Sequence, residues 1–79
     1  MNNSKFSAIM SVLVPQIVRL IQEKNTVDEI AASDMFYRSE VYALLEQEKT
    51  KLWHFSPLTL YTMFAEEQQT GAFEIPEEI

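Results

Sequence analysis

His54 is the only histidine of the chain and the side chain best suited to acid–base catalysis or metal binding near neutral pH. Either role needs partners held close to the ring. The chain has no cysteine, so a metal site would consist of His54 and carboxylates alone. Glu46 and Glu48 are near in the sequence, but they lie across a polar link. We therefore predict a surface or internally bonded histidine and no metal.

Other candidates for chemistry have simpler structural explanations. Ser56 precedes Pro57, which is typical of a helix N-cap rather than a nucleophile. Glu66 and Glu67 are neighbours on one expected helix, so their carboxylates diverge by about 100° and cannot face each other. The single glycine excludes a glycine-rich phosphate loop. We predict that the protein is not an enzyme and has no cofactor.

The stretch from Ser56 to Gly71 carries signals for both ends of a helix. Ser56 can cap the first turn, and Gly71 can adopt the left-handed conformation that closes the last. Leu60, Tyr61 and Phe64 share one face of this helix. The preceding segment, residues 52–55, is expected to lie across the core as an apolar plug, with Trp53 contributing most to burial.

Apolar residues repeat at spacings of three and four over residues 5–24, which predicts the first helix. The stripe consists of Phe6, Ile9, Met10, Leu13, Ile17, Leu20 and Ile21. Val12, Val14 and Val18 widen it, so this helix should be central in the domain or covered by a second chain. Pro15 interrupts the hydrogen bonding, which predicts a kinked or two-part helix.

Two shorter helices should follow. Thr26 and Glu29 have the spacing of a capping box, and the second helix should run to about residue 37. Its inward residues should be Val27, Ile30, Ala31 and Met35. Ser39 is the expected cap of a third helix, which should continue to Glu48.

These patterns predict a single all-α domain over residues 1–79. It is a small bundle of about four helices with a kinked or two-part first helix. A short extended segment, in which Phe73 and Ile75 alternate with Glu74, belongs to an acidic C-terminal tail over residues 72–79. One glycine and three prolines argue against a sandwich or barrel, which needs many turns.

The formal net charge is −6, and residues 52–79 contain five acidic and no basic side chains. This balance disfavours nucleic acid and anionic lipid surfaces and suits a basic protein partner. Pro15, Gln16 and Arg19 interrupt the apolar N-terminal run, and no cleavage site of a signal peptide follows it, so we predict no membrane span. The lack of cysteine fits a cytoplasmic location.

Several short motifs together resemble a family of short, acidic, helical bacterial proteins of unknown function, found mainly in gut anaerobes. The motifs are Val14-Pro15-Gln16-Ile17-Val18, Phe36-Tyr37-Arg38-Ser39, Tyr42, Leu44-Leu45, Glu48, Thr50, Leu52-Trp53-His54, Ser56-Pro57, Leu60-Tyr61, Glu67, Thr70-Gly71 and Pro76-Glu77-Glu78. The likeness implies no activity. Because related short proteins are found beside toxin-like or transferase-like genes, it implies a partner role.

The leading hypothesis is a non-enzymatic protein-interaction module that self-associates as a homodimer through its wide apolar first helix. The candidate contact residues are Val12, Val14, Val18, Trp53, Phe73 and Ile75. The alternative is an antitoxin-like or regulatory protein whose acidic half covers a basic site on a cognate protein. A third class, an enzyme using His54 with a carboxylate, is the least favoured.

Overall fold

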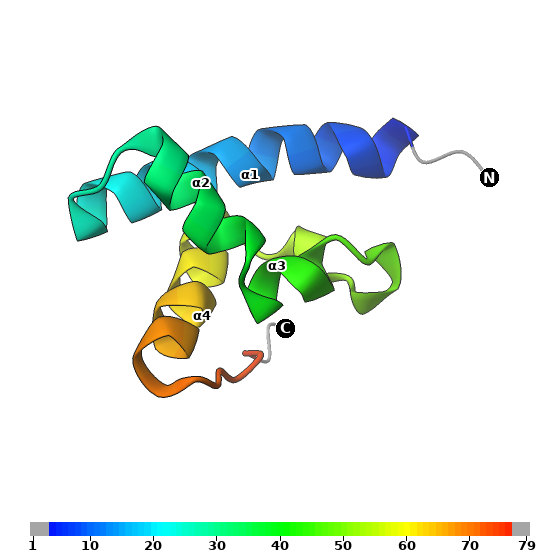
Figure 1. Cartoon of the computed structure of the whole chain (residues 1–79). Coiled ribbons are helices and arrows are strands. Elements are labelled where there is room, and N and C mark those ends of the chain that lie inside the picture. Colours follow the sequence, from blue (N-terminus) through cyan, green and yellow to red (C-terminus); the bar gives the residue numbers. More distant parts are fainter. Residues whose placement is uncertain (1–3, 77–79) are drawn as a thin grey trace.

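The structure, a computed structural model, describes residues 4–76 and is built from helices (Figure 1). The helices are α1 (Ser4–Asn25), α2 (Glu29–Tyr37), α3 (Glu40–Leu45) and α4 (Pro57–Thr70), with two 3-10 turns, η1 (Glu48–Thr50) and η2 (Leu52–His54), between α3 and α4. The described residues contain no strand, so the predicted all-α class is confirmed. Residues 77–79 of the expected acidic tail lie outside the described part.

The first helix, α1, continues through Pro15 without a break. The prediction was a kinked or a two-part helix, and the two-part form is not observed. Side chains on either side of the proline add bonds to the backbone: Ser11 Oγ donates to the Ala8 carbonyl at 2.8 Å, and Gln16 Nε2 donates to the Val12 carbonyl at 3.1 Å. At 22 residues, α1 is about 33 Å long. It therefore covers most of the longest dimension of the molecule, 38 Å.

The start of α2 differs from the prediction. Asp28, not Thr26, is the N-cap, and its carboxylate accepts a hydrogen bond from the Ala31 N–H at 2.8 Å. Thr26 cannot cap because it takes a left-handed conformation, φ 55°, in the turn after α1. The inward face also differs, since Ile30 is 82% exposed. Phe36 is the largest apolar side chain of α2, and its burial turns Ile30 outward.

The caps of the last two helices are those expected from the sequence. Ser39 Oγ accepts the Tyr42 N–H at 3.1 Å, and Ser56 Oγ accepts the Thr59 N–H at 3.1 Å. Gly71 closes α4 with φ 83°. However, α3 ends at Leu45, earlier than predicted, because the chain tightens into the two 3-10 turns.

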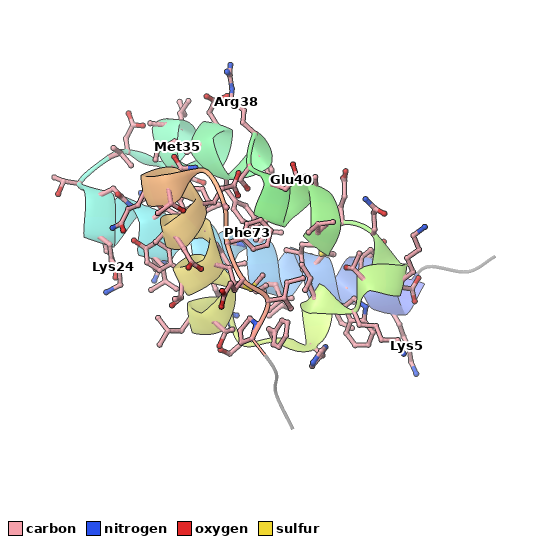
Figure 2. The ribbon with its side chains drawn as sticks, turned by 90° about the horizontal axis from the view of Figure 1, so that it is seen from below. Lys5, Lys24, Met35, Arg38, Glu40 and Phe73 are labelled. Carbon is pink, nitrogen blue, oxygen red and sulfur yellow. The ribbon has the colours of Figure 1, made fainter. Side chains whose placement is uncertain are left out.

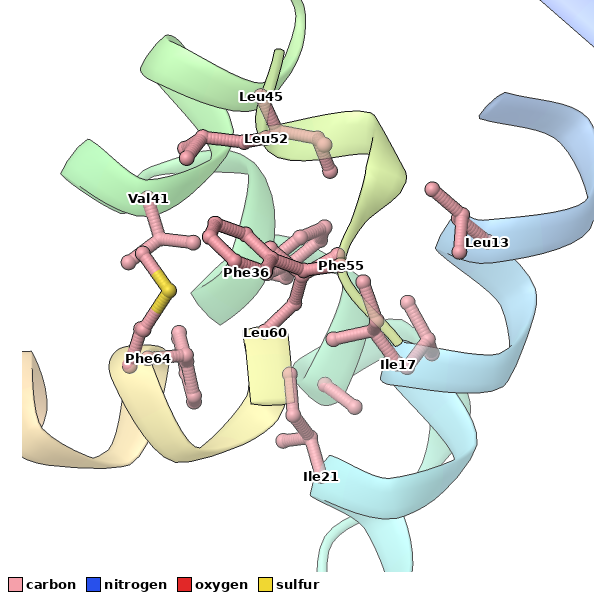
Figure 3. Close-up of a cluster of buried hydrophobic side chains, with 13 residues drawn as sticks. Leu13, Ile17, Ile21, Phe36, Val41, Leu45, Leu52, Phe55, Leu60 and Phe64 are labelled. Carbon is pink, nitrogen blue, oxygen red and sulfur yellow. The ribbon is translucent and has the colours of Figure 1, made fainter. Parts of the chain in front are cut away.

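The core lies where all four helices and η2 meet (Figure 3). Its buried residues are Leu13, Ile17, Val18, Ile21, Ala32, Phe36, Val41, Leu45, Leu52, Phe55, Leu60, Met63 and Phe64. Phe36 packs edge-on against Tyr42 and Phe64, with ring centroids 5.4 and 5.9 Å away. The predicted stripe of α1 is thus fully buried only from Leu13 onward, while Ile9 and Met10 pack against the edge of the core.

Residues 71–76 form the predicted segment without regular secondary structure after α4. Phe73 packs against the core, whereas Ile75 is 53% exposed. The Glu74 N–H donates to the Glu66 carboxylate at 3.2 Å, which holds this segment beside α4. The segment therefore covers part of the core with Phe73 alone (Figure 2).

Candidate interaction surface

The candidate catalytic residue, His54, lies at the surface. Its Nδ1 contacts the Lys51 carbonyl, and its ring stacks on Phe55 with centroids 4.4 Å apart. Within residues 4–76, no group of three His, Asp or Glu side chains could hold a metal ion. His54 is therefore part of the η2 turn, and no carboxylate of residues 4–76 lies within 4.0 Å of its ring nitrogens.

The other residues considered for catalysis, Ser56, Glu66 and Glu67, form hydrogen bonds with backbone groups. Ser56 Oγ caps α4 and donates to Thr59 Oγ1 at 3.0 Å. Glu66 accepts from the tail, and Glu67 accepts from the backbone at the start of α3, 26 and 27 residues away in the sequence. No local sequence pattern indicates this long-range role of Glu67. Among the described residues, every buried side-chain N or O atom has a hydrogen-bond partner.

Within the expected plug, residues 52–55, the buried side chains are not the predicted ones. Leu52 and Phe55 are buried, whereas Trp53 is only half-buried and donates from Nε1 to the Glu48 carbonyl at 2.9 Å. In a 3-10 turn, residues three apart point the same way. Leu52 and Phe55 therefore enter the core together and leave Trp53 at its edge.

The six predicted contact residues do not form one surface. Val18 is buried, with 6% exposed, so it belongs to the core. Val14, Trp53 and Phe73 are half-buried against the core. Val12, 58% exposed, lies on α1, while the other exposed member, Ile75, lies on the tail after α4.

The free side of α1 is a continuous surface, which we call the outward face. Its members are all exposed and recur at spacings of three, four or one: Lys5, Ala8, Val12, Pro15, Gln16, Arg19 and Glu23. Figure 1 shows α1 along one edge of the molecule, with α3 and α4 on its other side. Between residues 5 and 12, no side chain is buried.

A groove runs beside the C-terminal half of the outward face, where α1 meets the start of α4. Its lining includes Pro15, Arg19 and Leu20 from α1 and Pro57 and Leu58 from α4. Leu58 is 57% exposed although it is apolar. Sequence reasoning missed this residue because its neighbours Leu60 and Phe64 mark the opposite, buried side of α4.

The segment Lys5–Asn25 of α1 is long and apolar enough to cross a membrane on length and composition, with a mean hydropathy of 1.2 in its most apolar window. The mostly buried core helix of a soluble protein and a signal sequence near the N-terminus satisfy the same criteria. Here 22% of that window is buried inside the domain. The apolar character of α1 thus serves the core in part and is otherwise at the surface.

Comparison with family models, curated proteins and solved structures finds no match to the chain. The resemblance to short bacterial proteins therefore stays a prediction.

Proposed function

We propose that the protein is a non-enzymatic interaction module that associates with itself through the outward face of α1. The observation that carries this proposal is the exposure of Val12 in the middle of a helix with no buried side chain from residue 5 to residue 12. An apolar side chain that is exposed in the middle of a helix gains from burial against another molecule.

The size of the domain supports the same proposal. A chain of 79 residues buries about 60% of its unfolded surface, less than larger domains do. The groove beside Pro15 and Leu58 continues the outward face from α1 onto α4. Association would cover Val12 and Leu58 together, and a second copy is a partner that is always present.

Light scattering coupled to gel filtration tests the proposal with two matched variants. Val12→Lys places a charge in the outward face and should give the monomer mass of 9.2 kDa. Ile30→Lys changes a more exposed apolar residue on α2 and should leave the dimer intact. Dissociation by Ile30→Lys but not by Val12→Lys would contradict the proposed surface.

A lipid membrane is the other partner that could cover the exposed apolar side chains of α1. The formal net charge of −6 opposes adsorption to anionic lipid. In a flotation assay with vesicles of neutral and of anionic lipid, the protein should remain in the lower, lipid-free fraction. Co-flotation that Val12→Lys abolishes would overturn self-association in favour of lipid.

A basic cognate protein is the second candidate partner, favoured by the lack of any basic side chain after Lys51. Glu66 and Glu74 are exposed on this part of the chain. Such a partner, in an antitoxin-like or regulatory role in the cytoplasm, would copurify from the native host at low salt and elute as salt screens the attraction. Recovery of no basic protein at low salt would count against it.

A further inference from the structure

We propose that two copies pair their outward faces in antiparallel orientation, so that residues 5–13 of each α1 lie along residues 15–23 of the other. This inference rests on the proposed self-association and specifies its direction and register. Three features of α1 support it: the spacing of two opposite charges, the small side chain of Ala8, and the position of the groove.

The charges lie at the two ends of the outward face. Lys5 and Glu23 are both exposed and 18 residues apart, which is five full turns of an α-helix. They therefore point in the same direction, about 27 Å apart along the axis. Antiparallel pairing brings Lys5 of each copy to Glu23 of the other, and two-fold symmetry makes this ion pair twice.

Parallel pairing would have the opposite electrostatic result. It would place the two Lys5 side chains together at one end and the two Glu23 side chains together at the other. Like charges opposite each other disfavour an interface, whereas complementary charges fix its register. The charge pattern of α1 thus complements itself only when the helices run in opposite directions.

The apolar contacts agree with this register. When Lys5 faces Glu23, Val12 faces Gln16, and Ala8 lies near Arg19 and Leu20 of the second copy. That position adjoins the groove lined by Pro15, Leu20, Pro57 and Leu58. The small side chain of Ala8 allows the two helix backbones to approach closely. The groove of each copy thus receives the N-terminal part of the other copy's outward face.

One residue of the same chain competes for Lys5. Glu48 lines a hollow with Lys5, Phe6 and Trp53. The described residues contain one ion pair within 4.0 Å, between Arg38 and Asp34, so Lys5 is not bonded to Glu48. Glu48→Gln is therefore the matched control for Glu23→Lys.

Charge reversal tests the pairing by sedimentation equilibrium. Lys5→Glu and Glu23→Lys should each weaken the dimer by about tenfold, because each turns two attractive contacts into repulsive ones. The double variant should regain the wild-type dissociation constant. Both changes complement the helix dipole, so circular dichroism should show no loss of helix. Glu48→Gln should leave the dimer unchanged.

Two outcomes of this experiment have different meanings. A dimer that neither reversal weakens, or a double variant no tighter than the singles, would overturn the antiparallel register while leaving self-association in place. A wild-type protein that stays monomeric would remove the proposed function itself.

Cysteine cross-linking gives an independent answer, because the chain has no cysteine of its own. A mixture of Lys5→Cys and Glu23→Cys chains should form a disulfide dimer under mild oxidation. Neither variant alone should do so, since its two cysteines would be about 27 Å apart, whereas a disulfide needs Cα atoms within about 7 Å. Rapid dimerisation of the Lys5→Cys chain alone would indicate parallel helices and overturn the proposal.

Discussion

Glu67 Oε2 accepts a hydrogen bond from the backbone N–H of Glu40 at 2.8 Å, across a sequence separation of 27 residues. The other carboxylate oxygen, Oε1, accepts the N–H of Val41 at 3.1 Å. Glu40 is the first residue of α3, so Glu67 is a cap supplied by another helix. Its negative charge lies at the positive end of the α3 dipole and ties α3 to α4.

Replacing Glu67 with alanine should lower the free energy of unfolding by about 1–3 kcal/mol, because two backbone donors lose a charged acceptor. Glu66→Ala is the matched control on the same helix. Its carboxylate accepts one bond, from the exposed Glu74 N–H, so the loss should be smaller. Urea denaturation of both variants measures the difference. Equal losses would show that the Glu67 contact to α3 adds nothing.

Phe36 rather than Trp53 should be the aromatic residue on which stability depends most. Phe36 is fully buried among aromatic neighbours, and its replacement by alanine should cost about 3–5 kcal/mol. Trp53→Ala should cost less, about 1–2 kcal/mol, because the indole is only partly buried and its removal loses one hydrogen bond. Chemical denaturation followed by circular dichroism compares them. A larger loss for Trp53→Ala would mean that the indole is more deeply buried.

Tyr42 should titrate above the ordinary tyrosine pKa. Burial, with the nearby charge of Glu46 and the Tyr37 hydroxyl, raises the pKa of Tyr42 above its ordinary value of about 10. Folding therefore favours the neutral phenol. The stability that this gives is fully present below the unfolded pKa and is lost as pH rises through the folded pKa.

Alkaline titration of the tyrosinate absorbance checks this prediction. Tyr42→Phe should remove a tyrosine that ionises above the ordinary tyrosine pKa, and it should flatten the decline of stability in that pH range. If the group that Tyr42→Phe removes ionised at or below the ordinary pKa, the direction of the shift would be wrong.

The sequence predicted the elements whose ends are determined locally. The predicted caps are observed at Ser39, Ser56 and Gly71. A cap depends on residues within one turn, so the local sequence is enough to predict it. The all-α class followed from the spacing of apolar residues such as Leu13 and Ile17. These interactions need no knowledge of distant parts of the chain.

The sequence did not predict features that depend on packing or on competition between neighbours. Asp28 replaced Thr26 as the cap because Thr26 was required in the turn itself. Ile30 faces solvent because the larger Phe36 sets the buried side of α2. Glu67 contacts α3 only because α4 packs beside α3, so no local sequence pattern predicts this hydrogen bond.

The candidate surface was predicted in part. Periodicity indicated that α1 has more apolar side chains than one core can cover, and Val12 is indeed exposed. Val18 was assigned to the same surface although it faces the core. Leu58 was not assigned because its part in the groove depends on how α4 packs beside α1.

Sedimentation equilibrium of the full chain, from about 1 µM to about 1 mM, tests self-association most directly. We predict a mass that rises from 9.2 kDa toward twice that value, and a Val12→Lys variant that stays at 9.2 kDa over the whole range. A wild-type chain that remains at 9.2 kDa at the highest concentration would contradict the account.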